Sequence, residues 1–222
     1  MTIPFYVPPE QQVRDKAEFA RKGIARGRSI IAVDYAAGVL LLAENPSKAL
    51  HKISEVYDRI AFAGVGKYNE FETLRKAGIR QADLMGYLYS REDVTAMGLA
   101  TAFAQTLGAI FTREPKPFEV EVLIAEISEE GNEHRLYRVT YDGTLYDERN
   151  FVAIGGKAEQ LTEALQAAWE AGMSLERALE VATDVFRRAE GREIEGWEAG
   201  VLDTSNGRRT FRRLTPDELP AT

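Results

Sequence analysis

The sequence contains no cysteine and only two histidines, His51 and His134. The lack of cysteine excludes disulfide bonds, thiolate metal sites and a cysteine nucleophile, and it suits a reducing cytoplasm. Two histidines far apart argue against a Ser-His-Asp site and a histidine-rich metal site, although carboxylates could complete a ligand set. We therefore expect no metal, and any hydrolysis would need other chemistry.

Long apolar runs are also missing. The first ten residues, MTIPFYVPPE, have no basic stretch and are interrupted by prolines, so they do not read as a signal peptide. No segment approaches the roughly 20 apolar residues of a membrane helix. The net charge of -7 favours solubility and leaves no basic footprint for nucleic acid. The composition predicts a cytoplasmic protein without nucleic-acid or membrane partners.

What the sequence does contain is an ordered series of helical and strand patterns, within a length that fits one large domain. A leading helix is predicted from Pro9 to the stop signal at Gly23, with Val13, Ala17, Ala20 and Ile24 on one face. A hairpin of residues 29–35 and 39–43 follows it directly. Further strands are predicted at residues 53–64, 118–128, 135–141, 151–154, 200–204 and 210–214, and further helices at residues 69–85, 90–107, 157–171, 175–189 and 215–218.

Three of these expectations rest on local signals. Ser90 with Asp93 forms an approximate capping box that we expect to open the helix after it, and Ser174 is a candidate N-cap. Residues 118–154 are expected to form a meander, joined by the turn pairs 131–132 and 142–143. The order of elements predicts an α+β fold, a four-layer αββα sandwich of two antiparallel sheets flanked by helices, with an extra N-terminal helix.

The run EFARKGIARG followed by RSIIAVDYAAGVLLLAEN resembles the start of proteasome α subunits of the actinobacterial type. The resemblance covers nearly the whole chain and is most specific over residues 18–45, 52–66 and 116–125. It implies the Ntn-hydrolase fold in a single domain spanning residues 1–222. Within that domain it implies a gating tail at 1–8, the N-terminal helix at 9–24 and the sandwich at 25–222.

The resemblance also implies an empty catalytic position. Catalytic β subunits begin at a freed threonine, whose amine accepts the proton of its own hydroxyl. Alignment of Gly27-Arg28-Ser29-Ile30-Ile31-Ala32 with the β pattern Gly-Thr-Thr-Ile-Val-Ala puts Arg28 at the nucleophile. A guanidinium has no hydroxyl and stays protonated, so it can neither attack nor serve as the base. The predicted upstream helix would also prevent a free strand terminus, so no catalytic residue is expected.

Two partners of the old site are expected to persist, since the catalytic aspartate falls on Glu44 and the lysine on Lys52. In α subunits the lysine at this position receives the C-terminal carboxylate of an activator, and the same carry-over puts Gly27, Gly66 and Lys67 at the pocket walls. Without the resemblance, Glu44 and Lys52 would be ordinary surface charges, Gly27 would end a turn and Gly66 would relieve a strand end. A phosphate loop at residues 64–67 is rejected because Ala61 and Tyr68 break the Walker pattern, so no cofactor is expected.

The resemblance implies two constrictions of a central channel. The first is a gate formed by the apolar tail, for which the alternative is a frayed terminus. The second is a loop beneath the gate, which two nearby prolines favour as non-helical and for which the alternative is a plain helix-to-strand connection. The gate residues are Ile3, Pro4, Phe5, Tyr6, Val7 and Pro8, and the loop residues are Thr112, Arg113, Glu114 and Pro115.

The leading hypothesis is a non-catalytic α-ring subunit of a bacterial 20S proteasome core. Seven copies would form a ring, stack on a ring of proteolytic β subunits, dock a ring ATPase through its C-terminal tail and pass unfolded protein substrate. The enzyme alternative is a self-compartmentalising hydrolase that starts at Ser29 and uses it as nucleophile. A third alternative is a free-standing, monomeric binding domain.

Overall fold

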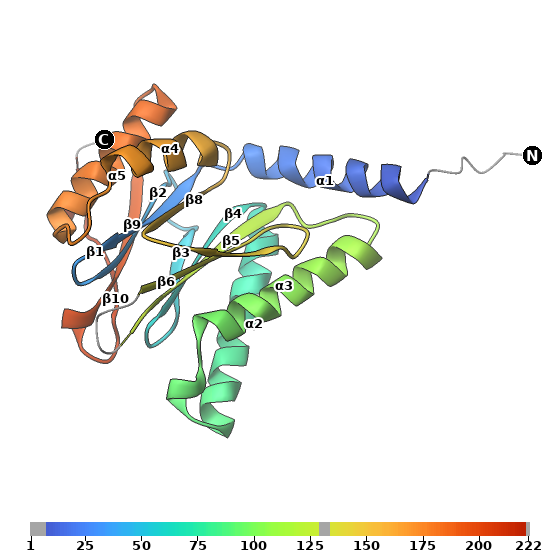
Figure 1. Ribbon diagram of the computed structural model, residues 1–222, viewed down its shortest axis with the longest axis horizontal. Helices are drawn as coiled ribbons and strands as arrows, with labels where there is room; N and C mark the ends of the chain where they lie inside the picture. Colours follow the sequence, from blue (N-terminus) through green and yellow to red (C-terminus); the bar gives the residue numbers. More distant parts are fainter. Residues whose placement is uncertain (1–7, 129–133, 221–222) are drawn as a thin grey trace, which may run out of the picture.

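The computed structural model describes residues 8–128 and 134–220. Two five-stranded antiparallel sheets pack face to face between two helical layers (Figure 1). Helices α4 and α5 cover one outer face, α2 and α3 cover the other, and α1 extends away along the top of the view. This is the four-layer α+β sandwich with an additional N-terminal helix that the sequence predicts.

One sheet is assembled from strands that are far apart in the sequence, and the other has its strands in consecutive order. One sheet has the strand order β10-β9-β2-β1-β8, and the other has the order β3-β4-β5-β6-β7. The first comprises β1 (Ile30–Tyr35), β2 (Gly38–Glu44), β8 (Phe151–Ile154), β9 (Trp197–Asp203) and β10 (Phe211–Arg213); the second comprises β3 (Ile53–Tyr57), β4 (Ile60–Gly66), β5 (Val120–Ile127), β6 (His134–Val139) and β7 (Leu145–Glu148).

The helices carry their own boundary signals. Thr95 caps α3 by accepting from the Gly98 amide, and Ser174 caps α5 by accepting from the Arg177 amide, which confirms Ser174 as an N-cap. Gly191 ends α5 in the left-handed region, where glycine has no Cβ to clash. The α-helices are α1 (Pro9–Ala25), α2 (Tyr68–Leu88), α3 (Ala96–Arg113), α4 (Ala158–Ala168) and α5 (Leu175–Glu190); the 3-10 helices are η1 (Arg91–Asp93), η2 (Thr204–Asn206) and η3 (Pro216–Glu218).

The β1–β2 hairpin is buried on both faces because it lies between another sheet and a helical layer. Ile30 and Leu41 point into the core between the sheets, whereas Ile31 and Leu40 pack in the cluster beneath α4 and α5. A strand buried on both sides must be apolar at every position rather than at alternate ones. The uninterrupted apolar run of β2 therefore fixes this hairpin at the centre of its sheet.

Helix α1 joins this core at its C-terminal end. Ala20 and Ile24 are buried in the cluster between the sheets, and Ala17 packs against it, as predicted. Val13, which the sequence places on the same face, is half exposed. It belongs to the N-terminal half of α1, and that half of the helix extends beyond the sheets (Figure 1). Lys16 ties α1 to the end of α3 by donating to the carbonyl of Phe111 at 3.0 Å.

Two predicted connections differ from the structure. Ser90 and Asp93 do form a capping box, but it caps the short helix η1, and α3 begins later at its own cap. Residues 151–154 do not continue the meander, because β8 pairs with β1 in the opposite sheet. The meander is completed instead by β7, which the sequence analysis does not predict. Of the two expected turn pairs, 142–143 forms a turn and 131–132 lies outside the described residues.

The predicted channel loop is partly helical. Thr112 and Arg113 form the end of α3, and the Thr112 hydroxyl donates to the Gly108 carbonyl at 2.8 Å. The prediction of a non-helical loop is therefore wrong for these two residues. The reason is that proline restricts the residue before it, so Pro115 forces Glu114 out of the helix but leaves Arg113 free to be helical. Only Glu114 and Pro115 belong to the connection.

Asp34 is an ionisable group that the fold buries at a cost. Within the described part of the chain, its Oδ1 atom is buried without a hydrogen-bond partner, and the nearest imidazole nitrogen, Nε2 of His134, lies 3.7 Å away. Burial disfavours the charged form and raises the pKa of Asp34 to about 7. Folding therefore becomes less favourable when Asp34 ionises.

We expect Asp34→Asn to stabilise the protein at alkaline pH only. A carboxyl group whose pKa is raised in the folded state contributes stability below its unfolded pKa of about 4 and loses it as the pH rises through about 7. Urea unfolding should therefore favour the variant by about 1–3 kcal/mol more at pH 8.5 than at pH 5. Asp184→Asn, at an exposed position, is the control and should show no such change. An equal effect of Asp34→Asn at both pH values would contradict this expectation.

Candidate functional site

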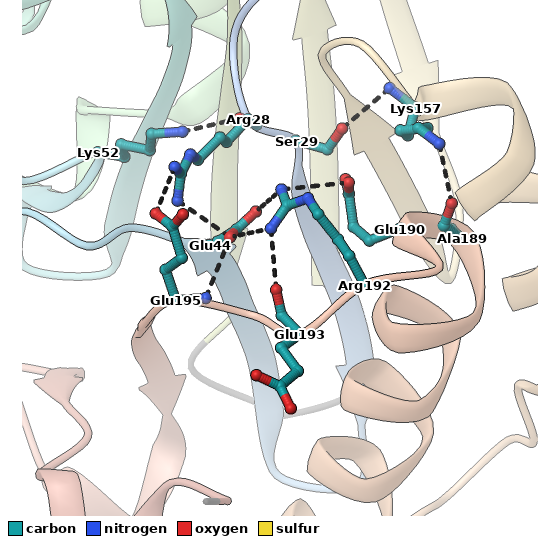
Figure 2. A network of polar contacts seen from close by, with 10 residues as sticks. All are labelled: Arg28, Ser29, Glu44, Lys52, Lys157, Ala189, Glu190, Arg192, Glu193 and Glu195. Atoms are coloured by element: carbon teal, nitrogen blue, oxygen red, sulfur yellow. Dashed lines mark hydrogen bonds and ion pairs between the residues drawn. The ribbon is translucent and has the colours of Figure 1, made fainter. Parts of the chain in front are cut away.

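Arg28 lies in the short link between α1 and β1, where a cluster of charged side chains meets (Figure 2). This is the end of the sandwich at which β1 begins and β2 ends, and we call it the mouth of the sandwich. Its guanidinium donates through Nη1 to Glu44 at 3.0 Å and through Nη2 to Glu195 at 2.6 Å. Both terminal nitrogens of the guanidinium are thus paired, one with a carboxylate on β2 and the other with a carboxylate in the segment before β9.

Glu44 is the centre of this cluster. It ends β2, and its side chain is 0% exposed. Four hydrogen bonds reach it: one from Arg28, two from Arg192 at 2.8 and 2.7 Å, and one from the backbone amide of Glu195 at 3.2 Å. Burial alone would raise the pKa of Glu44, but these bonds and the two guanidinium charges outweigh burial, so the pKa lies below its usual value. Glu44 is therefore ionised, and it is not the surface charge that its sequence alone would suggest.

Arg192 is the functional neighbour that the sequence analysis did not find. It directly follows the left-handed residue Gly191 at the end of α5, which turns the chain back toward the mouth of the sandwich. Arg192 also contacts Glu190 at 3.3 Å. The sequence does show a charged stretch, GREIEGWE, at residues 191–198. Local sequence patterns, however, do not indicate that these charges face residue 44.

Lys52 lies beside Arg28, where the chain enters β3. Its ammonium donates to the carbonyl oxygen of Arg28 at 2.8 Å (Figure 2). Burial lowers the pKa of Lys52 to about 8, and the repulsion from Arg28 adds to this, while the charges of Glu198 and Glu44 act in the opposite direction. The predicted pair Glu44 and Lys52 is therefore brought together around Arg28.

This arrangement holds no nucleophile at residue 28. The neighbouring hydroxyl, that of Ser29, is buried and accepts a hydrogen bond from the Lys157 amide at 3.0 Å. The chain runs from α1 through Arg28 into β1, so the backbone nitrogens of Arg28 and Ser29 belong to peptide bonds. Within the described residues, these groups form a charge-paired junction between elements.

The structure brings two of the predicted pocket glycines together. A Cβ atom on Gly27 would lie 2.5 Å from Val65 Cγ1 and 3.0 Å from the Gly66 nitrogen, so the two backbones approach too closely for a side chain. Gly66 has a φ of +106° at the end of β4, a conformation that L side chains rarely adopt. Both glycines are thus required by the fold itself.

Lys67 lies next to these glycines but points elsewhere. Its backbone amide donates to the carbonyl of Glu119 at 3.0 Å, and its ammonium lies 4.0 Å from Glu70 on α2. About half of the side chain is exposed. Lys67 therefore flanks the two glycines, and its ammonium faces α2.

The predicted gate falls mostly outside the described residues. Ile3, Pro4, Phe5, Tyr6 and Val7 are not described, and Pro8 is the exposed residue that precedes α1. Among the described residues, no three histidine, aspartate or glutamate side chains are grouped as they would be around a metal ion. In the same part of the chain, no helix is long and apolar enough to cross a membrane.

Comparison with known proteins supports the resemblance noted in the sequence. A model of the proteasome subunit family matches residues 24–202. The proteasome subunit alpha of Kineococcus radiotolerans is 54% identical over 97% of this chain and 95% of its own length, and that of Thermomonospora curvata is 55% identical over 96% and 94%. The proteasome subunit alpha of Paenarthrobacter aurescens is 50% identical over 99% of this chain and 97% of its own length.

We expect Arg192→Gln to destabilise the protein by more than the loss of an exposed ion pair would, because it leaves the buried Glu44 carboxylate with fewer charged donors. Glu44 has a lowered pKa, so its contribution is present above about pH 4.3 and is lost as the pH falls through its folded pKa. The loss measured by urea unfolding should therefore be larger at pH 7.5 than at pH 4.

Arg177→Gln is the matched control. Arg177 pairs with the exposed Glu180 within α5, the helix that Arg192 follows. An exposed pair of this kind is worth about 0–1 kcal/mol. Equal losses from the two variants would contradict the central role of Glu44.

Proposed function

The chain belongs to the proteasome α-subunit family, and on that premise we propose that it forms the non-catalytic outer ring of a bacterial 20S proteasome core particle. Seven copies would make the ring, which would stack on a ring of proteolytic β subunits in the cytoplasm. The ring would admit unfolded protein to the chamber and would serve as the docking platform for a ring ATPase.

The observation that carries this proposal is the occupation of the nucleophile position by Arg28. Its guanidinium pairs with the buried Glu44, and its carbonyl accepts from Lys52. The residues that would orient a threonine in a catalytic subunit are here engaged with a side chain that cannot attack a carbonyl. The starting point of the alternative hydrolase, Ser29, has its hydroxyl buried and engaged by the Lys157 amide.

Lys52 supports the proposed docking role. Its ammonium is largely buried but bonds to a backbone carbonyl rather than to a carboxylate, so it keeps the capacity to pair with an incoming anion. A charge-assisted hydrogen bond of this kind contributes about 1.5–3 kcal/mol, and several tails bound to one ring would add avidity. We assign Gly27 and Gly66 to the wall of this pocket and Lys67 to its rim.

Co-expression with the β subunit from the same organism tests the proposed assembly. Native mass spectrometry should find seven copies of this chain in each outer ring, and peptidase activity should depend on the β subunit. Replacement of the β nucleophile by alanine should abolish all activity while the particle remains assembled. A monomeric chain in the presence of the β subunit, or activity that survives this replacement, would refute the proposal.

We also propose that residues 2–8 close the pore of the ring. Deletion of these residues should raise hydrolysis of a fluorogenic peptide by the assembled particle several-fold, because entry would no longer be obstructed. The matched control replaces the same residues with a glycine-serine segment of equal length, which separates chain length from apolar character. Unchanged hydrolysis after the deletion, with assembly intact, would rule out this gating role.

A further inference from the structure

A second buried carboxylate, that of Glu198, organises the chain on the other side of Lys52. Glu198 lies on β9 and is 7% exposed. Its two oxygens accept hydrogen bonds from Asn45, from the start of β3 and from β10, and the imidazole of His51 lies beside them. The hydrogen-bond donors are Asn45 Nδ2 at 2.7 Å, the Lys52 amide at 2.9 Å, the Ile53 amide at 3.2 Å and Arg213 Nη1 at 2.6 Å, and His51 Nδ1 lies 3.4 Å away.

Two of these bonds fix the backbone of the docking lysine itself. Glu198 accepts from the amides of Lys52 and Ile53, and Arg213 Nη2 donates to the carbonyl of Ile53 at 2.8 Å. The start of β3 is thus held through two backbone amides, which donate to Glu198, and through one backbone carbonyl, which accepts from Arg213. A side chain can be aimed reproducibly only from a fixed backbone, so this double attachment gives the Lys52 ammonium a defined position.

The same carboxylate opposes the cost of burying Lys52. The charged groups that act on the Lys52 ammonium are Glu198 on β9, Arg28 in the link before β1 and Glu44 on β2. The charge of Glu198 is shared with Arg213 from β10. Arg28 therefore works against the protonated lysine, Glu198 and Glu44 work for it, and Arg213 acts only through its pairing with Glu198.

We propose that Glu198, restrained by Arg213, is a positioning residue that holds the Lys52 ammonium in place and protonated, and so sets how firmly the α-ring pocket takes the terminal carboxylate of an activator. This inference rests on the proposed function, because it assumes that Lys52 is the docking group. It adds a role for β9 and β10, which contribute no residue to the pocket proposed above.

The proposal has a signature in the pH dependence. Burial lowers the pKa of Lys52 to about 8, and the charge of Glu198 limits that shift. The affinity for a carboxylate should therefore fall as the pH rises through about 8. Removal of the Glu198 charge should move this fall to lower pH, whereas removal of Arg213 should move it to higher pH. Simple loosening of the site would expose Lys52 and raise its pKa in both variants.

The first measurement is the pKa of Lys52 in the assembled particle, obtained from competitive acetylation followed by mass spectrometry. We expect the midpoint to fall by about one pH unit in Glu198→Gln and to rise in Arg213→Gln. Midpoints that move in the same direction, or do not move, would overturn the proposal.

Glu55→Gln is the matched control. Glu55 also lies on β3 and also ties it to the β9–β10 hairpin, through Arg209 Nε at 2.8 Å and Nη2 at 2.6 Å. It is absent from the groups that act on Lys52. The Lys52 midpoint should therefore be unchanged in this variant, although an ion pair between the same elements has been removed.

The second measurement is binding of a peptide that carries the last seven residues of the ring ATPase from the same organism, with a free carboxylate or a terminal amide. The free carboxylate should bind the wild-type particle better than the amide, and Lys52→Met should remove that preference. Glu198→Gln should weaken binding by about tenfold at pH 8.5 and less at pH 7.

The outcomes separate the two proposals. Lack of carboxylate preference in the wild type, or preference that survives Lys52→Met, overturns the docking function and this inference with it. Loss of preference in Lys52→Met, together with unaltered affinity and pH profile in Glu198→Gln, overturns only the positioning role of Glu198.

Discussion

A carboxylate that is fully shielded from solvent must be paired, and the pairing of Glu44 is the constraint on which the rest of this site depends. An isolated buried charge is costly enough that the surrounding chain has to supply donors. Here they come from the link before β1, from the loop after α5 and from a backbone amide. Glu44 thereby joins β2 to two other segments, the link before β1 and the loop after α5, and Arg28 is held as a structural ion-pair partner.

The same hairpin that builds the core also delivers the site. β1 and β2 are apolar on both faces because sheets and helices cover them, so their ends are placed by packing rather than by local polar contacts. Arg28 and Glu44 occupy the two ends of this hairpin that lie together at the mouth of the sandwich. Lys52 enters from the opposite sheet, at the start of β3, where Glu198 on β9 accepts from its amide and Arg213 on β10 donates to the carbonyl of Ile53. The site is therefore a meeting of both sheets, and its two buried carboxylates come from the adjacent strands β2 and β9 of one sheet.

Much of this was accessible from the sequence because it depends on local patterns or on close family resemblance. The order of helices and strands follows from hydrophobic periodicity, and the resemblance identified Arg28, Glu44 and Lys52 as neighbours. Arg192 and Glu198 were missed because their roles depend on which loop and which strand return to the site, which is a property of tertiary topology. The strand at residues 151–154 was assigned to the wrong sheet for the same reason, since short apolar strands do not encode their partner.

The central claim is that the chain retains the architecture of an N-terminal-nucleophile hydrolase but keeps its nucleophile position closed by a paired arginine. Intact mass spectrometry of this chain, taken from an active particle purified with its β subunit, tests the claim most directly. The account predicts a single species that still contains α1 and Arg28. A species that begins at Ser29, and that hydrolyses peptides without any partner subunit, would contradict it.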